Sequence, residues 1–101
     1  RFLQEFLYPQ GIVVQPDTAR RMIRNQNPQG FRTRGLGFDV GEGVGPKQHP
    51  DTFGHTGSTG TLCWADPATE TVCVVLTTLP ARAARPHPRD LTSDAVAQAV
   101  V

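Results

Sequence analysis

The segment FGHTGSTGTLCWADP, residues 53–67, sets the interpretation of the chain. It falls in a Thr-rich stretch from Thr52 to Ala65 that predicts a β-strand. Asp66-Pro67 then gives a turn signal, and a nearly continuous β-branched run extends from Thr71 to Leu79. The two runs predict a β-hairpin. Because residues 72–76 lack polar alternation, we expect the second strand to be covered on both faces by helices.

Helical patterns lie on either side of this hairpin. Residues 1–7 carry an apolar stripe with helical spacing. A second helix is expected over about residues 16–25, because Pro16 suits the first position of a helix and the helix-breaking residues 27–30 follow it. Residues 31–40 alternate loosely and predict a further strand. Thr92 or Ser93 is the expected N-cap of a last helix. The predicted fold class is α+β, with about three antiparallel strands packed by helices and a C-terminal helix.

The charge balance limits the partners of this chain. Ten basic and nine acidic residues give a formal net charge of +1 in 101 residues. This charge creates no strong field for nucleic acid or an anionic membrane, and the basic residues over positions 20–24 are interpreted as a solvated helix face. No apolar run reaches the length of a membrane span. We therefore expect neither nucleic-acid binding nor a membrane span in this segment.

The ends of the sequence favour a portion of a larger domain. Helical apolar spacing begins at Phe2, directly after Arg1, so we expect the chain to start inside an element, and the helix-forming residues before Val101 reach no stop signal. We expect residues 1–101 to be the C-terminal portion of one domain, whose N-terminal part lies upstream. The remainder of that domain would then be the main partner of this chain.

The segment at residues 53–61 resembles the third active-site motif of serine β-lactamase-like proteins. That motif is usually Lys-Thr-Gly, and it is His-Thr-Gly in many class C-like and family VIII esterase-like branches; here it is His55-Thr56-Gly57. The resemblance extends over nearly the whole chain, and the family it indicates includes penicillin-binding-protein-like hydrolases. It is carried also by Phe2-Leu3-Gln4, Gln15-Pro16-Asp17-Thr18-Ala19, Gly35-Leu36-Gly37-Phe38 and the Asp66-Pro67 hairpin.

This resemblance implies roles for four catalytic-site residues. In such proteins the backbone N–H after the motif glycine, here that of Ser58, stabilises the oxyanion of acyl transfer. Gly57 lets the strand edge lie close to the helix that carries the nucleophile. His55 and Thr56 would line the cavity and bind substrate or hold the proton network.

Two other motifs of the family are missing from the chain. Its single lysine, Lys47, has no serine three residues before it, so the Ser-x-x-Lys motif of the nucleophile is absent. The only tyrosine stands in Tyr8-Pro9-Gln10, so Tyr-x-Asn is absent as well. Both motifs normally lie upstream of this region, and we therefore expect the 101 residues alone to be inactive.

The resemblance implies a parent serine hydrolase that works through an acyl-enzyme. Its substrate would be an ester, a β-lactam or a D-amino-acid peptide, with an ester favoured because His55 replaces the lysine of dedicated β-lactamases and DD-peptidases. The alternative is a non-catalytic binding or structural module derived from the same fold. No metal or other cofactor is expected, because the spacing of His49, Asp51 and His55 matches no familiar ligand pattern.

Cys63 and Cys73 flank the predicted hairpin turn. Their positions leave open a disulfide across the hairpin, although two buried free thiols are the expectation.

Overall fold

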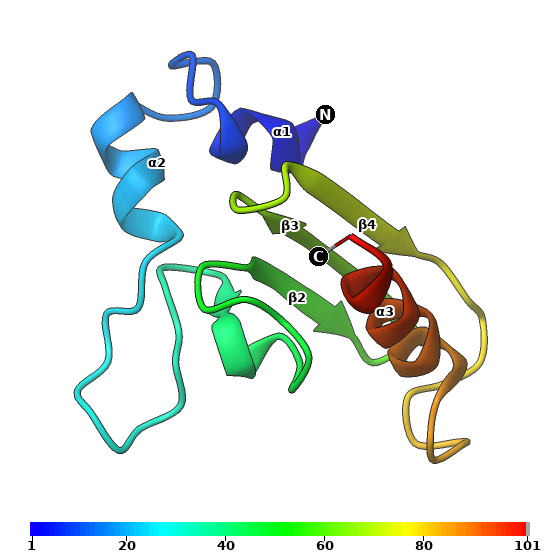
Figure 1. The fold of residues 1–101 in the computed structure, drawn as a ribbon. Helices are drawn as coiled ribbons and strands as arrows, with labels where there is room; N and C mark the ends of the chain where they lie inside the picture. Colours follow the sequence, from blue (N-terminus) through cyan, green and yellow to red (C-terminus); the bar gives the residue numbers. More distant parts are fainter. Residues whose placement is uncertain (101) are drawn as a thin grey trace.

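The structure is a computed structural model that describes residues 1–100, and it contains helices on both sides of one antiparallel sheet (Figure 1). The helices are α1 (Phe2–Leu7), α2 (Pro16–Met22) and α3 (Pro88–Ala99), with a short 3-10 helix η1 at Gly41–Gly43. The strands are β1 (Asp39–Val40), β2 (Phe53–Gly57), β3 (Thr61–Asp66) and β4 (Thr71–Val75). The predicted α+β class is confirmed.

The sheet follows the order β1-β2-β3-β4, with every neighbouring pair antiparallel. The predicted hairpin across Asp66-Pro67 is confirmed, because β3 pairs with β4 from Leu62↔Val75 to Asp66↔Thr71. The single strand predicted over residues 52–65 is wrong. It consists of β2 and β3, separated by a tight turn in which the Gly60 N–H donates to the Gly57 carbonyl over 3.0 Å. Gly60 permits this turn because its φ is +100°.

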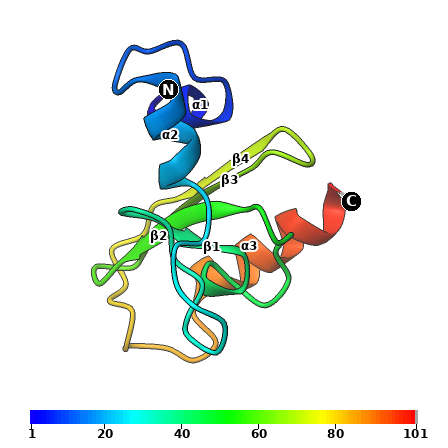
Figure 2. The ribbon, with the colours of Figure 1, turned by 90° about the vertical axis from the view of Figure 1, so that its left-hand side faces the viewer.

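The alternation of β3 directs its side chains into two separate cores. Ala65 and the half-buried Cys63 face the core built with α1 and α2, whereas Leu62 and Trp64 face the core built with α3. Figure 2 shows the consequence: α1 and α2 lie on one side of the sheet and α3 lies on the other.

The core beside α1 is aromatic. Phe6, Phe38 and Phe53 are at most 8% exposed, and their rings meet mainly edge to face with centroids 5.0 to 6.5 Å apart. This geometry is the one that aromatic quadrupoles favour. It anchors the start of β2 against the first helix.

The core beside α3 is centred on Trp64, which is fully buried. Its indole N–H donates to the Ser93 hydroxyl over 2.8 Å. Ser93 is therefore an interior partner of the sheet and no N-cap, which corrects the predicted start of the last helix. α3 begins at Pro88, and the cap is His87, whose Nδ1 accepts from the Arg89 N–H over 3.0 Å.

Three other predicted element bounds are wrong, the first being the second hairpin strand, which ends at Val75 and not at Leu79. The strand expected over residues 31–40 is reduced to β1 and an isolated bridge between Arg34 and Asp39, because Gly35–Phe38 form a turn closed by the Gly35 N–H on the Phe38 carbonyl. Gly35 lies so close to the end of α2 that an added Cβ would be 2.0 Å from the Met22 carbonyl oxygen. α2 ends at Met22, three residues before the expected Asn25.

The expectation that β4 is covered on both faces is met on one face within residues 1–100. Cys73 and Val75 pack toward α3. Val72, Val74 and the following Leu76 face the other way and are 38%, 56% and 78% exposed. These three side chains form an apolar strip that stays partly open to solvent.

The two cysteines point to opposite faces of the sheet. Cys63 lies opposite Val74, and Cys73 lies opposite Trp64. The two cysteines are therefore offset by one residue in the strand pairing, which places their side chains on opposite faces. Both are free thiols, which rules out the open alternative of a disulfide. Burial, followed by the nearby Cys63, raises the pKa of the Cys73 thiol.

Asp66 ties the β3–β4 turn to the loop before β2. Its side chain is 3% exposed and accepts from His49 Nδ1 over 2.5 Å, from the Thr69 hydroxyl over 2.9 Å and from the Ala68 N–H over 2.9 Å. Burial raises the pKa of Asp66, but these hydrogen bonds outweigh it, and the pKa lies below its ordinary value.

Replacing Asp66 with Asn should destabilise the fold. A carboxylate with a lowered folded-state pKa stabilises the protein above the unfolded-state pKa, and this contribution is lost as the pH falls through the folded-state pKa. We expect Asp66→Asn to lower the free energy of unfolding by about 1–3 kcal/mol at neutral pH. In strong acid the variant and the wild type should differ much less. Urea unfolding at the two pH values measures this, with the exposed Asp51→Asn as control; equal losses in acid and at neutrality would contradict the assignment.

Candidate functional site

Strand β2 presents a free edge next to the motif residues. It pairs with β3 along its whole length but with β1 only at Phe53 and Gly54. Gly54 is the last residue of β2 that pairs with β1, and no other residue fits there, because a Cβ on Gly54 would lie 2.1 Å from the Cys63 carbonyl oxygen. Beyond it, residues 55–57 have a sheet partner on one side only.

The Gly57–Ser58 peptide has a defined orientation. The Gly57 carbonyl accepts from the Gly60 N–H over 3.0 Å and from the Arg89 guanidinium over 2.7 Å. In a planar trans peptide the N–H points opposite to the carbonyl, so the Ser58 N–H points away from β3. Ser58 is exposed, and its N–H makes no hydrogen bond with any of residues 1–100. This amide is a free donor at the strand edge.

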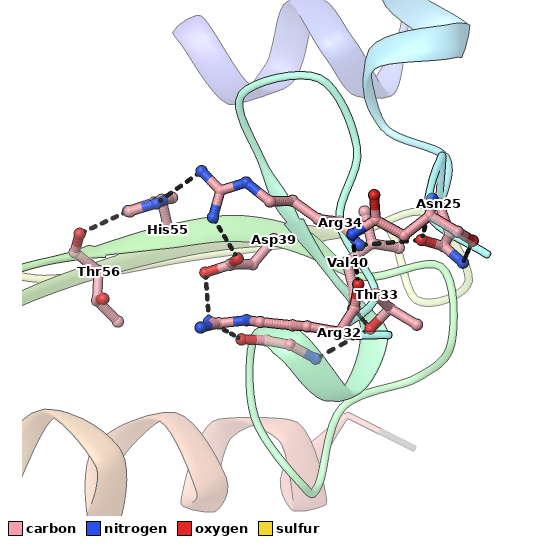
Figure 3. A network of polar contacts seen from close by, with 10 residues as sticks. Asn25, Arg32, Thr33, Arg34, Asp39, Val40, His55 and Thr56 are labelled. Carbon is pink, nitrogen blue, oxygen red and sulfur yellow. Dashed lines mark hydrogen bonds and ion pairs between the residues drawn. The ribbon is translucent and has the colours of Figure 1, made fainter. Parts of the chain in front are cut away.

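His55 is held at both ring nitrogens (Figure 3). Nδ1 lies 2.7 Å from the Thr56 carbonyl oxygen, and because that oxygen only accepts, Nδ1 carries the proton. Nε2 faces a nitrogen of Arg34 at 3.5 Å. A guanidinium only donates, so Nε2 can only accept in this contact, which is long for a hydrogen bond.

Arg34 is itself fixed by a buried carboxylate. Asp39 is 2% exposed and pairs with Arg34 over 3.1 Å and with Arg32 over 3.0 Å. Figure 3 shows the two guanidinium groups on either side of this carboxylate, with His55 beyond Arg34. Two cations on one anion leave a positive excess beside the strand edge.

The motif residues line a cavity of about 460 Å³. His55, Thr56 and Gly57 form its β2 side, and its other walls come from α1, β3 and the open strip of β4. The remaining lining residues are Arg1, Phe2, Leu3, Thr61, Leu62, Cys63, Val72, Val74 and Leu76. A second hollow, of about 530 Å³, lies beside α1 near Tyr8 and is lined by none of the four predicted site residues.

The structure therefore brings the four predicted residues to one exposed strand edge. His55, Thr56 and Ser58 are exposed, and Gly57 is half-buried. Arg34, Asp39 and Arg89 were not predicted. Arg34 and Arg89 come from segments 21 and 32 residues away from their contacts in the motif, and no local spacing marks such long-range contacts.

The side chains with other chemistry lie elsewhere. Ser93, the only serine besides Ser58, is buried between Trp64 and Gln48, with no base beside it. Among the described residues, no group of three or more His, Cys, Asp or Glu side chains could hold a metal ion. Over the same part of the chain, no helix is both long and apolar enough to cross a membrane.

The fold and the site thus define an α+β protein that presents its motif strand at a free edge of the sheet. The family model described as Beta-lactamase matches residues 1–98. The chain belongs to the beta-lactamase family, whose fold is of the serine-hydrolase type. A search of curated proteins found no match.

Proposed function

We propose that this chain is the C-terminal portion of a serine hydrolase domain that acts through an acyl-enzyme. The chain supplies the third motif, His55-Thr56-Gly57, and the oxyanion-binding amide of Ser58. The nucleophilic serine and its lysine come from an upstream segment of the same domain. The proposal rests chiefly on the free Ser58 N–H, which directly follows Gly57, the last of the three motif residues that line the cavity.

The open strip of β4 supports a missing neighbour on this face. Val72, Val74 and Leu76 belong to the wall of the same cavity and remain exposed. Complete burial of an exposed side chain of this kind contributes about 1.5–3 kcal/mol, and these side chains retain 38% to 78% of their exposure, so a helix laid over the strip gains a share of that energy and lies next to His55. The upstream part of the domain is the occupant we propose, and it would carry the nucleophile to the cavity.

The reaction follows from these positions. The upstream lysine takes the proton of the serine hydroxyl as its oxygen attacks a substrate carbonyl, whose oxygen becomes an oxyanion that accepts from the Ser58 N–H. Collapse of the tetrahedral intermediate expels the alcohol or amine, which takes up that proton, and water then cleaves the serine ester of the acyl-enzyme to release the acid and restore the serine hydroxyl. Thr56 and His55 border the reacting group and orient it. An ester is the favoured substrate over a β-lactam or a D-amino-acid peptide, because His55 stands in place of the lysine of dedicated β-lactamases and DD-peptidases.

Active-site labelling tests the proposed class of reaction. The protein that carries this chain, with its natural flanking sequence, should react with a fluorescent fluorophosphonate and, more slowly, with a fluorescent penicillin. Peptide mapping should locate the label on a serine outside residues 1–101, since the chain has no Ser-x-x-Lys. No labelling, as expected of a non-catalytic module, or labelling of Ser58 or Ser93, would contradict the proposal.

A bulky residue at position 57 should disturb the oxyanion site. A Cβ on Gly57 would lie 2.3 Å from the Thr61 hydroxyl, so valine forces the Thr61 side chain to move and adds bulk directly beside the Ser58 amide. We expect Gly57→Val to reduce the acylation rate by about 10²–10³-fold, the effect of losing one oxyanion donor. Stopped-flow acylation with a chromogenic ester measures the rate. Thr59→Val, on the exposed part of the same turn, is the control and should acylate normally; a Gly57→Val rate equal to that of the control would refute the role of this edge.

A further inference from the structure

Arg89 connects the last helix to the turn that carries the motif. It is the second residue of α3, and its side chain is only 12% exposed. One terminal nitrogen, Nη1, donates to the Gly57 carbonyl over 2.7 Å and to the Thr61 carbonyl over 3.1 Å. A single guanidinium thus spans both ends of the β2–β3 turn.

The contact with Gly57 fixes the amide on the other side of the same peptide. Because the peptide is planar, the Ser58 N–H cannot turn toward β3 unless the Gly57 carbonyl leaves both Arg89 and the Gly60 N–H. One of these two hydrogen bonds is charge-assisted, which makes it the stronger kind. Reversal of the peptide is therefore disfavoured before any substrate binds.

The charge of Arg89 acts along the same peptide. A cation at the carbonyl oxygen polarises the amide, and hydrogen bonds in such a chain strengthen one another. The Ser58 N–H is consequently a better donor than an amide whose carbonyl faces water.

The rest of the guanidinium is poorly satisfied. Nε is buried without a hydrogen-bond partner in the described part of the chain, and the Asp90 carboxylate lies 3.6 Å away, too far for a hydrogen bond. Buried donors without a partner are uncommon in folded proteins and call for an explanation. The side chain of Arg89 is placed so that Nη1 makes both hydrogen bonds to the motif turn, and Nε is left without a partner.

We infer that Arg89 is a positioning residue for the oxyanion site: it holds the Gly57–Ser58 peptide with the Ser58 amide directed out of the strand edge and polarised toward an oxyanion. This inference rests on the proposed function for its catalytic meaning. It adds to that proposal a residue from α3 that does not touch the substrate.

Arg89→Met tests the inference in the protein with its natural flanking sequence. Methionine keeps much of the apolar stem and removes the donors and the charge. We expect the maximal acylation rate to fall by about ten- to hundredfold, less than the 10²–10³-fold effect of losing an oxyanion donor outright. The KM for a neutral ester should change little, because an oxyanion forms only in the transition state. Arg89→Lys, which keeps one cationic donor, should recover part of the rate and also serves if Arg89→Met fails to fold.

A second readout does not depend on activity. The ¹H and ¹⁵N shifts of the Ser58 amide should move in Arg89→Met and only partly in Arg89→Lys. The control is Arg82→Met, an exposed arginine that makes no hydrogen bond or ion pair within residues 1–100, and it should leave rate and shifts unchanged.

The outcomes separate the two proposals. If the protein is not labelled but its Ser58 amide shifts respond to Arg89→Met, the hydrolase function would be overturned, whereas the role of Arg89 in orienting the Gly57–Ser58 peptide would stand. A labelled protein in which Arg89→Met acylates like Arg82→Met, or loses only substrate affinity, would overturn the positioning role and keep the function. Unmoved Ser58 shifts in Arg89→Met would also overturn it.

Discussion

The orientation of one peptide, between Gly57 and Ser58, determines what this chain can do. Its carbonyl is engaged from the turn by Gly60 and from α3 by Arg89, and planarity then directs its N–H out of the sheet. Each partner depends on a different level of structure. The Gly60 contact needs only a tight turn with a positive φ, whereas the Arg89 contact needs α3 packed against the sheet through Trp64 and Ser93. Local geometry and tertiary packing thus converge on one amide.

The two faces of the sheet are unequal, and this inequality places the cavity. α3 covers the face that holds Trp64 and Cys73, which secures the position of Arg89. On the other face, α1 covers the start of β2 through an aromatic core but leaves the strip from Val72 to Leu76 open. The motif edge therefore borders an apolar surface as well as a polar network of Asp39, Arg34 and His55. Such a combination suits a site completed by another segment of the domain.

Local signals in the sequence predicted a large part of this arrangement. The turn at Asp66-Pro67 and the β-branched run after it defined the β3–β4 hairpin, and the resemblance to serine β-lactamase-like proteins indicated the four residues at the strand edge. The turn inside residues 52–65 escaped prediction because Thr-rich composition favours strand on both sides of it. His87 is an unusual cap, so the start of α3 was placed too late. Arg34 and Arg89 act across long sequence separations, and only tertiary packing brings them to the motif.

The most direct measurement is a crystal structure of the protein, with its natural flanking sequence, bound to an arylboronic acid. The boronate adduct of a serine is tetrahedral and anionic, so one of its oxygens occupies the position of the oxyanion. We expect that oxygen at about 2.7–3.1 Å from the Ser58 nitrogen, with the Gly57 carbonyl still accepting from Arg89. A boronate oxygen out of reach of that amide, or a Gly57 carbonyl turned toward the adduct, would contradict it.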